Sequence, residues 1–504
     1  MIKYQLYDLH VKVNSMQSKR KGEKSMKERK VLRRVVPIIM VFSMLLTMLP
    51  SVTANAASTT EKKGSVSFTK TKASGFTKIA SLRSTSNYLI VLGEKKSGNV
   101  LSYSSDGNTF KDVDLDAAIE KEYKGETLSS ITLNTYISYI NKRNAYCVMG
   151  TAATKEEATY NFLVSVSSDM KKVSVEKLDD LIKTLDSQAE GIEFDRYFDY
   201  DYETGLLIVN GSYNEASGSK VPVYIVMKKG ADAIAYKNPN TFCDRVEFVG
   251  KYLVCYNWQL NLTGEWEQAT TGYFYYSKDY KTWTKAKTPE VNDANSWQRS
   301  YYEWETFGAA PQSSSDTYTL YYTSNMKDFK SISKKFVISG YGTMDFQQDD
   351  KKLYAIERGY DEKQEIAISL KSGDKWKVLF QYKAKSNDFN YQEDRYTADG
   401  MVLIKDGTTK KLFLYGKGKE YSTKLDVDKL NLYGDMNGVT FGTYDNNYLL
   451  ASKNALATYY LFKTPVKVKG VTSWSKKNVA ERFYVYSDSA IYYVTQATVT
   501  KAVK

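Results

Sequence analysis

The sequence predicts an all-β fold built from repeated antiparallel sheets. Short apolar runs recur along the chain, and most begin 46 to 60 residues after the previous one. The runs are Leu89–Leu92, Tyr146–Met149, Leu206–Val209, Tyr252–Cys255, Leu353–Ile356, Met401–Ile404 and Tyr448–Leu450. One longer gap of 101 residues contains a further tyrosine-rich unit at Tyr318–Tyr322. A period of about fifty residues is typical of repeat architectures.

Each apolar run is followed by turn residues and then by a second run rich in tyrosine or valine, as Leu89–Leu92 is followed by Val100–Tyr103. This pattern predicts β-hairpins. Because the runs are continuously apolar and do not alternate with polar residues, their sheets need cover on both faces, as the blades of a propeller provide. We therefore predict a single β-propeller over residues 76–504. It has about eight four-stranded antiparallel blades, with seven as the alternative.

The ends of this array and its few helices can also be placed. The hairpin at Arg482–Val494 is expected to complete the first blade by pairing with N-terminal strands, because a closed circle leaves no open sheet edge. Asp114–Tyr123 and Val175–Leu185 predict short helices in loops between strands.

Residues 1–56 have the pattern of a secretory signal peptide with a basic N-terminal extension. Lys27 to Arg34 form a basic flank, Val35 to Leu49 an apolar segment, and Ala54-Asn55-Ala56 a cleavage site of small residues. The alternative is an uncleaved anchor, which the shortness of the apolar segment disfavours. We expect Gram-positive-type bacterial export, a secreted or loosely wall-associated chain without a membrane span in its mature form, and a short linker at 57–75.

The net charge says little about partners once the leader is removed. The whole chain has 71 basic and 58 acidic residues, and residues 1–56 hold 11 and 3 of them, which leaves about +5. Lysines are spread along the chain instead of clustering, which argues against nucleic-acid binding. The most they imply is a weak attraction to anionic wall polymers.

The single histidine, His10, lies in the predicted leader. A mature chain without imidazole excludes Ser-His-Asp and Cys-His catalysis and a histidine-ligated zinc site. The run Asp112 to Asp116 hints at calcium, but Ala117 stands where a calcium loop needs glycine. We expect no metal and no cofactor.

Three cysteines remain: Cys147, Cys243 and Cys255. A bridge between Cys243 and Cys255 across a hairpin is one alternative, and free buried thiols are the favoured one.

Four predicted turns share the pattern Ser-x-Asp followed, four residues after the aspartate, by a large apolar residue, with two copies degraded. They are Ser104–Phe110, Ser167–Val173, Ser277–Trp283 and Thr323–Phe329. The pattern resembles the Asp-box, or BNR repeat, of sialidase-superfamily propellers. The resemblance covers turns in about half of the units and implies a fold, because in that family these turns lie on the rim away from the active centre. The family's Arg-Ile-Pro motif is absent, so no catalytic residue carries over.

Arginines form one candidate binding set. Five of them directly follow an acidic or amide residue: Asp195-Arg196, Asp244-Arg245, Gln298-Arg299, Asp394-Arg395 and Glu481-Arg482. They can form a ring of guanidinium groups for an anionic ligand, with Arg245 and Arg299 as the residues to test. The favoured alternative is that each pair is a structural clip between adjacent blades.

Tryptophans form the second set. Five of the seven lie between residues 258 and 304, and Trp258, Trp266 and Trp304 are the candidate ligand contacts. An indole beside carboxylates suits a pyranose, which has an apolar face and a polar rim. The favoured alternative is half-buried tryptophans of the fold. If the site cleaved glycosides, Glu265 and Glu303 would be the carboxylate pair to test.

The function that these observations favour is recognition of a glycan or another extracellular polymer, by a monomer. A glycan-cleaving hydrolase or lyase that uses carboxylates or tyrosine is one alternative. A protein-interaction scaffold is the other.

Overall fold

The chain divides into two compact units, Met1–Ala57 and Ser58–Lys504, and the fold described here is that of the second. The computed structural model describes residues 57–503 except 242, 244, 257, 261–265, 269–272, 288–306, 310–316, 324, 340–341, 350–351, 361–362, 395–399 and 437. The predicted leader at 1–56 lies outside the described residues.

The described residues form nine sheets of three to five strands and one separate hairpin. Sheet 1 contains β4 (Phe76–Ser84), β5 (Leu89–Lys95), β6 (Gly98–Ser104) and β7 (Lys111–Asp114). Sheet 2 contains β8 (Leu128–Leu133), β9 (Ser138–Ile140), β10 (Ala145–Thr154), β11 (Thr159–Ser167) and β12 (Val173–Lys177). Sheet 3 contains β13 (Glu190–Tyr200), β14 (Leu207–Asn214), β15 (Lys220–Met227) and β16 (Ile234–Lys237). Sheet 4 contains β17 (Val246–Val249), β18 (Tyr252–Tyr256), β21 (Tyr273–Ser277) and β22 (Trp283–Lys287), and the separate hairpin is β19 (Trp258–Leu260) with β20 (Trp266–Gln268).

The second half repeats this plan. Sheet 5 contains β23 (Phe307–Ala309), β24 (Thr317–Thr323) and β25 (Lys330–Lys335). Sheet 6 contains β26 (Gly342–Asp349), β27 (Lys352–Gly359), β28 (Glu365–Ser372) and β29 (Lys375–Lys383). Sheet 7 contains β30 (Phe389–Asp394), β31 (Met401–Asp406), β32 (Thr409–Leu414) and β33 (Lys419–Ser422). Sheet 8 contains β34 (Leu430–Met436), β35 (Val439–Tyr444), β36 (Tyr448–Ser452) and β37 (Thr458–Lys463), and sheet 9 contains β38 (Gly470–Lys476), β39 (Val479–Tyr486) and β40 (Ile491–Thr495).

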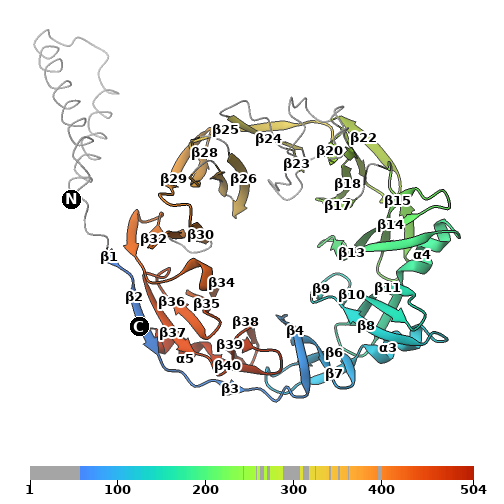
Figure 1. Cartoon of the computed structure of the whole chain (residues 1–504), viewed down its shortest axis with the longest axis horizontal. Helices are drawn as coiled ribbons and strands as arrows, with labels where there is room; N and C mark the ends of the chain where they lie inside the picture. Colours follow the sequence, from blue (N-terminus) through green and yellow to red (C-terminus); the bar gives the residue numbers. More distant parts are fainter. Residues whose placement is uncertain are drawn as a thin grey trace, which may run out of the picture. The chain divides into compact units, whose positions relative to one another are not determined.

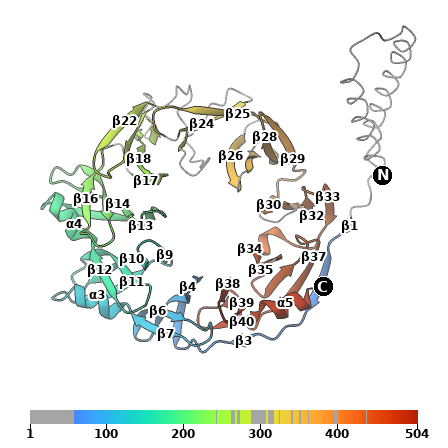
Figure 2. The ribbon, with the colours of Figure 1, turned by 180° about the vertical axis from the view of Figure 1, so that it is seen from behind.

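The nine sheets follow one another around a circle in chain order, with first strands such as β4, β13 and β34 toward its centre (Figure 1). Figure 2 shows the same arrangement from behind. The fold is a β-propeller, as the sequence predicts.

Burial explains why the sheets need each other. The middle strands are apolar on both faces: the first five residues of β5 and the first four of β31 are all buried. Among the described residues, nine buried apolar clusters lie between consecutive sheets, and each cluster draws on two neighbours. Leu101 and Phe162, for example, join sheets 1 and 2. A sheet removed from this series would expose both of its faces.

The series closes between sheet 9 and sheet 1. Ile79 and Val91 of sheet 1 share a cluster with Trp474 and Ile491 of sheet 9. The indole N–H of Trp474 donates to the carbonyl of Thr85 at 2.7 Å. The two ends of the array are therefore held by an apolar contact and a hydrogen bond.

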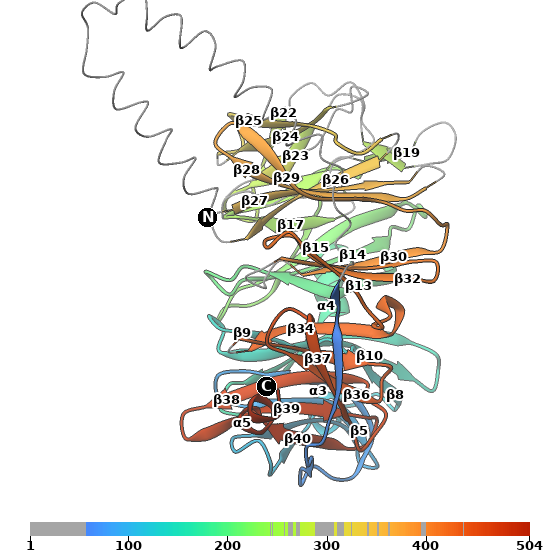
Figure 3. The same ribbon diagram turned by 90° about the vertical axis from the view of Figure 1, so that its left-hand side faces the viewer.

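The N-terminal segment adds edge strands to the last three sheets. β1 (Ala57–Ser58) joins the edge of sheet 7, β2 (Thr60–Gly64) pairs in parallel with β37, and β3 (Thr69–Lys70) pairs antiparallel with β40. Figure 3 shows this segment, in blue, crossing the sheets of the C-terminal part. The stretch 57–75, which the sequence predicts as a linker, thus carries three strands. Its polar composition suits edge strands, since most residues of β2 are exposed.

The predicted number of blades, eight or seven, is not confirmed, because the described residues already form nine sheets. The hairpin predicted at Arg482–Val494 is present in β39 and β40, but it belongs to sheet 9 and does not complete sheet 1. The physical reason is that β38 supplies an inner strand and β3 an outer one, so this hairpin completes a sheet of its own.

The helices are short. α3 (Asp116–Glu122) and α4 (Leu178–Leu185) confirm the two predicted helices, and α5 (Gln496–Ala502) and the 3₁₀ helix η1 (Val427–Lys429) are additional. No helix in the described part of the chain is long and apolar enough to cross a membrane. Cys147 and Cys243 are buried and unbridged, and Cys255 is buried as well, in agreement with the favoured alternative.

The turns that resemble Asp boxes share one geometry. In sheet 1, Asp106 Oδ1 accepts the amides of Asn108 at 2.8 Å and Thr109 at 2.7 Å, and Ser104 Oγ donates to it at 2.8 Å. Asp169, Asp279 and Asn325 make corresponding contacts in sheets 2, 4 and 5.

The residue after each of these side chains has a positive φ, between 60° and 71°; the four are Gly107, Met170, Tyr280 and Met326. Gly107 also approaches sheet 9 closely, since a Cβ there would lie 2.1 Å from Tyr484 Oη. Tyr484 donates to the Gly107 carbonyl at 3.1 Å, so this turn also joins the two ends of the array.

We predict that Trp474→Ala weakens the whole propeller, because the truncation empties a buried site between sheets 9 and 1. The expected loss is about 3 to 5 kcal/mol of unfolding free energy, measured by urea denaturation. Lys477→Ala, an exposed change in the following turn, is the control and should leave the midpoint unchanged. Equal midpoints for Trp474→Ala and wild type would contradict closure at this contact.

We also predict a pH dependence from the sheet 1 turn. Burial raises the pKa of Asp106, but hydrogen bonds from the Thr109 and Asn108 amides and from the Ser104 hydroxyl lower it more, to about 2. A carboxyl with a lowered folded-state pKa contributes stability above its ordinary value of 3.8, and this contribution is lost as the pH falls toward 2. Asp106→Asn keeps an acceptor oxygen, as Asn325 shows in sheet 5. Urea midpoints between pH 6 and pH 2 should therefore fall less in Asp106→Asn than in wild type, and parallel curves would contradict this role.

Candidate functional site

A pocket of about 580 Å³ lies on sheet 3 where the chain crosses to sheet 4. It is within the size range of small-ligand sites, about 300 to 1,000 Å³. Its lining residues are Glu193, Phe194, Asp195, Gly211, Ser212, Lys220, Pro222, Thr241 and Arg245.

Three strands and one loop bring these residues together. β13 supplies Glu193, Phe194 and Asp195, and β14 and β15 supply the next four. Thr241 and Arg245 lie between β16 and β17. The pocket is thus formed by three strands of sheet 3 and by the loop that leads to sheet 4.

Gly211 lets β13 and β14 approach closely at the pocket. Gly211 is paired with Phe194, and a Cβ at Gly211 would lie 2.5 Å from the carbonyl oxygen of Glu193 and 2.6 Å from the ring of Phe194. The pairing of the two strands also shifts between Phe194 and Phe198. Because no side chain fills the space at Gly211, the half-buried ring of Phe194 forms part of the pocket lining.

The charges of the pocket are balanced in two pairs. Lys220 Nζ lies 3.1 Å from Glu193 Oε2, and Arg245 Nε lies 3.8 Å from Asp195 Oδ2. All four side chains are between 45% and 71% exposed, so these pairs add little stability and remain open to a ligand. The lining therefore offers hydrogen-bond donors and acceptors without a net charge.

Of the candidate ligand-binding residues predicted from the sequence, Arg245 lines this pocket, and so does Asp195 of the predicted Asp195-Arg196 pair. Trp258 and Trp266 lie in the hairpin β19–β20, where Trp258 pairs with Gln268 and Trp266 with Leu260. Trp304, Arg299, Glu265 and Glu303 lie outside the described residues.

Three arginines join neighbouring sheets, and two of them, Arg245 and Arg482, belong to the pairs for which the sequence favours a structural clip. Arg245 at the start of sheet 4 meets Asp195 of sheet 3. Arg358 of sheet 6 donates through Nε to the hydroxyl of Tyr391 in sheet 7 at 2.6 Å. Arg482 of sheet 9 donates to the carbonyl of Asp106 in sheet 1 at 2.8 Å. A structural role for Arg245 does not conflict with ligand contact, since its side chain is 52% exposed.

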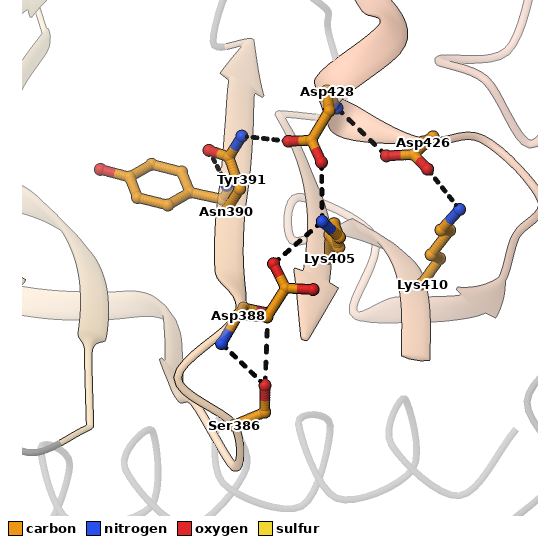
Figure 4. Close-up of polar contacts among 8 residues, drawn as sticks. All are labelled: Ser386, Asp388, Asn390, Tyr391, Lys405, Lys410, Asp426 and Asp428. Atoms are coloured by element: carbon orange, nitrogen blue, oxygen red, sulfur yellow. Dashed lines mark hydrogen bonds and ion pairs between the residues drawn. The ribbon is translucent and has the colours of Figure 1, made fainter. Parts of the chain in front are cut away.

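A second polar cluster lies on sheet 7 (Figure 4). Lys405 Nζ contacts Asp428 at 2.7 Å and Asp388 at 2.9 Å, and Lys410 contacts Asp426 at 2.6 Å. The hydrogen bonds that Lys405 donates to Asp428 and Asp388 raise the pKa of Lys405, and the one to Asp428 lowers the pKa of that carboxyl. Because these ion pairs tie η1 and the residue before it to β31 and β32, we assign the cluster a structural role. The described residues also contain no group of three or more histidine, cysteine, aspartate or glutamate side chains that could hold a metal ion.

Sequence reasoning missed Glu193, Phe194 and Lys220. The nearest sequence signal was the pair Asp195-Arg196, which lies on β13 together with Glu193 and Phe194. Glutamate and lysine are common in this chain, and their convergence depends on the pairing of β13, β14 and β15, which no local pattern specifies.

No family model and no curated protein matches the sequence. Among solved structures, a post-proline cleaving enzyme from Rickettsia typhi is 11% identical over 76% of this chain and 57% of its own, with a TM-score of 0.36. An uncharacterised protein from Listeria monocytogenes is 11% identical over 81% of this chain and 99% of its own, with a TM-score of 0.35. A sialidase from Trypanosoma rangeli is 10% identical over 87% of each chain, with a TM-score of 0.26.

Likeness at these identities and TM-scores carries no argument about the role of this chain. The chain also spans little more than half of the length of the Rickettsia enzyme. The assignment of a propeller rests on the packed sheets themselves, and function has to be argued from the site.

Proposed function

We propose that the protein is a secreted propeller module that recognises a glycan or another extracellular polymer through the pocket on sheet 3. The observation that carries the proposal is the composition of that pocket: two exposed cation–carboxylate pairs, two hydroxyl side chains and one half-buried phenyl ring line a single space. This combination suits a sugar ring.

The side chains of the pocket match the hydroxyl groups and the apolar face of a sugar ring. Sugar hydroxyls both donate and accept hydrogen bonds, so Glu193 and Asp195 can accept from them while Lys220 and Arg245 donate to them. The apolar face of a pyranose can lie against the ring of Phe194, as sugars do on aromatic side chains. A pocket without net charge accommodates such a ligand without leaving a charge unpaired.

Binding is favoured over cleavage. A glycosidase needs two carboxylates on opposite sides of the scissile bond, one of them kept protonated by a raised pKa. Here Glu193 and Asp195 lie two residues apart on one strand, and each faces a cation. Two carboxylates on one strand, each beside a cation, do not form the opposed pair that cleavage needs.

Export is part of the proposal and rests on the leader pattern of residues 1–56. N-terminal sequencing of protein recovered from the culture medium should give Ala57 as the first residue; an uncleaved chain held in the membrane would contradict it.

The test is a glycan-array screen followed by calorimetry with the glycan that binds best, on wild type and three variants. Lys220→Ala and Arg245→Ala remove pocket donors, and each should raise Kd about threefold to tenfold, the equivalent of one hydrogen bond of roughly 0.5 to 1.5 kcal/mol. Lys237→Ala is the matched control. Lys237 is also exposed on sheet 3 and pairs with Glu215 at 3.0 Å, but it does not line the pocket. An array without a bound glycan, or unchanged affinity in both pocket variants, would contradict the proposal.

A further inference from the structure

A second exposed surface lies on the inner strands next to the pocket. It is formed by Arg83 of β4, Tyr136 between β8 and β9, and Tyr197 of β13, and we call it the Tyr–Arg surface. The guanidinium of Arg83 lies 5.2 Å from the ring centroid of Tyr136, and the rings of Tyr136 and Tyr197 meet edge to face at 6.0 Å and 87°. Three neighbouring sheets therefore contribute to one cluster.

The exposure of these rings is unusual for this chain. Tyr213, Tyr224 and Tyr484 are fully buried, whereas Tyr136 is 42% and Tyr197 is 56% exposed. The contacts among Arg83, Tyr136 and Tyr197 hold the rings in place without covering them. Fixed and exposed tyrosine and arginine side chains are typical of binding surfaces, because little side-chain freedom is lost when a ligand arrives.

Two exposed arginines can meet an anionic ligand. Arg83 and Arg196 are both exposed, and among the described residues neither guanidinium forms an ion pair. On β13, Asp195 faces Arg245, and Asp199 accepts the amide of Phe248 at 2.8 Å. An anionic ligand would complement the two arginines.

The surface adjoins the pocket along β13. Asp195 lines the pocket, Arg196 follows it, and Tyr197 is the next residue. Two residues of extended chain span at most roughly 7 Å, so the backbone of Tyr197 lies within that distance of Asp195. A polymer with one unit in the pocket can therefore extend onto Tyr197.

We propose that the pocket and the Tyr–Arg surface bind one extended, carboxylated polysaccharide. A sugar in the pocket is followed by units that lie against Tyr197, and their carboxylates meet the guanidinium groups of Arg83 and Arg196. This inference rests on the proposed function and names the class of its ligand. A polysaccharide fits better than an acidic peptide, because the pocket on the same strand offers paired donors and acceptors for hydroxyl groups.

The test compares long and short probes. Calorimetry is done with polygalacturonate and with monomeric galacturonate, on wild type, Arg83→Gln, Tyr197→Ala and Lys220→Ala. We expect Arg83→Gln and Tyr197→Ala each to weaken polygalacturonate binding at least tenfold and to leave binding of the monomer unchanged. Lys220→Ala should weaken both. Tyr360→Ala is the matched control, since Tyr360 is 53% exposed but belongs to the distant sheet 6.

The outcomes separate the two proposals. If Lys220→Ala weakens both probes while Arg83→Gln and Tyr197→Ala change neither, the pocket binds sugar and the extended site is wrong. If Lys220→Ala changes neither probe, the pocket itself is wrong, whatever the other variants do. Equal affinity of wild type for polyglutamate or dextran sulfate and for polygalacturonate would show that the surface responds to charge alone, and it would overturn the choice of a carboxylated sugar polymer. Thermal unfolding of each variant at the wild-type temperature confirms that the fold is intact.

Discussion

The structure depends on packing between neighbouring sheets. Each sheet is apolar on both faces, and each face is buried against the next sheet. No single sheet of three to five strands can bury residues such as Val91 in β5 or Leu403 in β31 by itself, and each of the nine clusters is completed by the next sheet. A linear series would leave one face bare at each end. The contact of Trp474 and Ile491 with Ile79 removes both bare faces at once, and the edge strands β2 and β3 extend the N-terminal segment across sheets 8 and 9.

This packing restricts which residues can contact a ligand. The middle strands are occupied by the core, so side chains that can meet a ligand belong to the inner strands and to the crossings between sheets. Three charges of the pocket follow this rule, since Glu193 and Asp195 lie on β13 and Arg245 on the approach to β17, whereas Lys220 comes from the start of β15. The turns that resemble Asp boxes serve the scaffold instead, because Gly107 accepts from Tyr484 of sheet 9 and Tyr280 accepts from Tyr224 of sheet 3.

Much of the fold could be predicted because its signals are local: apolar runs at a steady period, hairpin turns and two short helices. The N-terminal edge strands could not, since a strand such as β2 pairs through its backbone and shows no apolar pattern. The ninth sheet was missed for a related reason, because β38 and β3 complete it from distant parts of the chain. At the site, Arg245 could be singled out, but its meeting with Glu193 and Lys220 depends on strand register and on the close approach at Gly211.

Hydrogen exchange at the closing contact tests the central claim most directly. The amide of Ile79 in sheet 1 donates to the carbonyl of Asp488, which lies between β39 and β40 of sheet 9, at 2.7 Å. A closed circle predicts that this amide exchanges as slowly as the amide of Val91 in the middle of sheet 1. Exchange orders of magnitude faster at Ile79, with Val91 still protected, would show that the sheets do not close and would contradict the account.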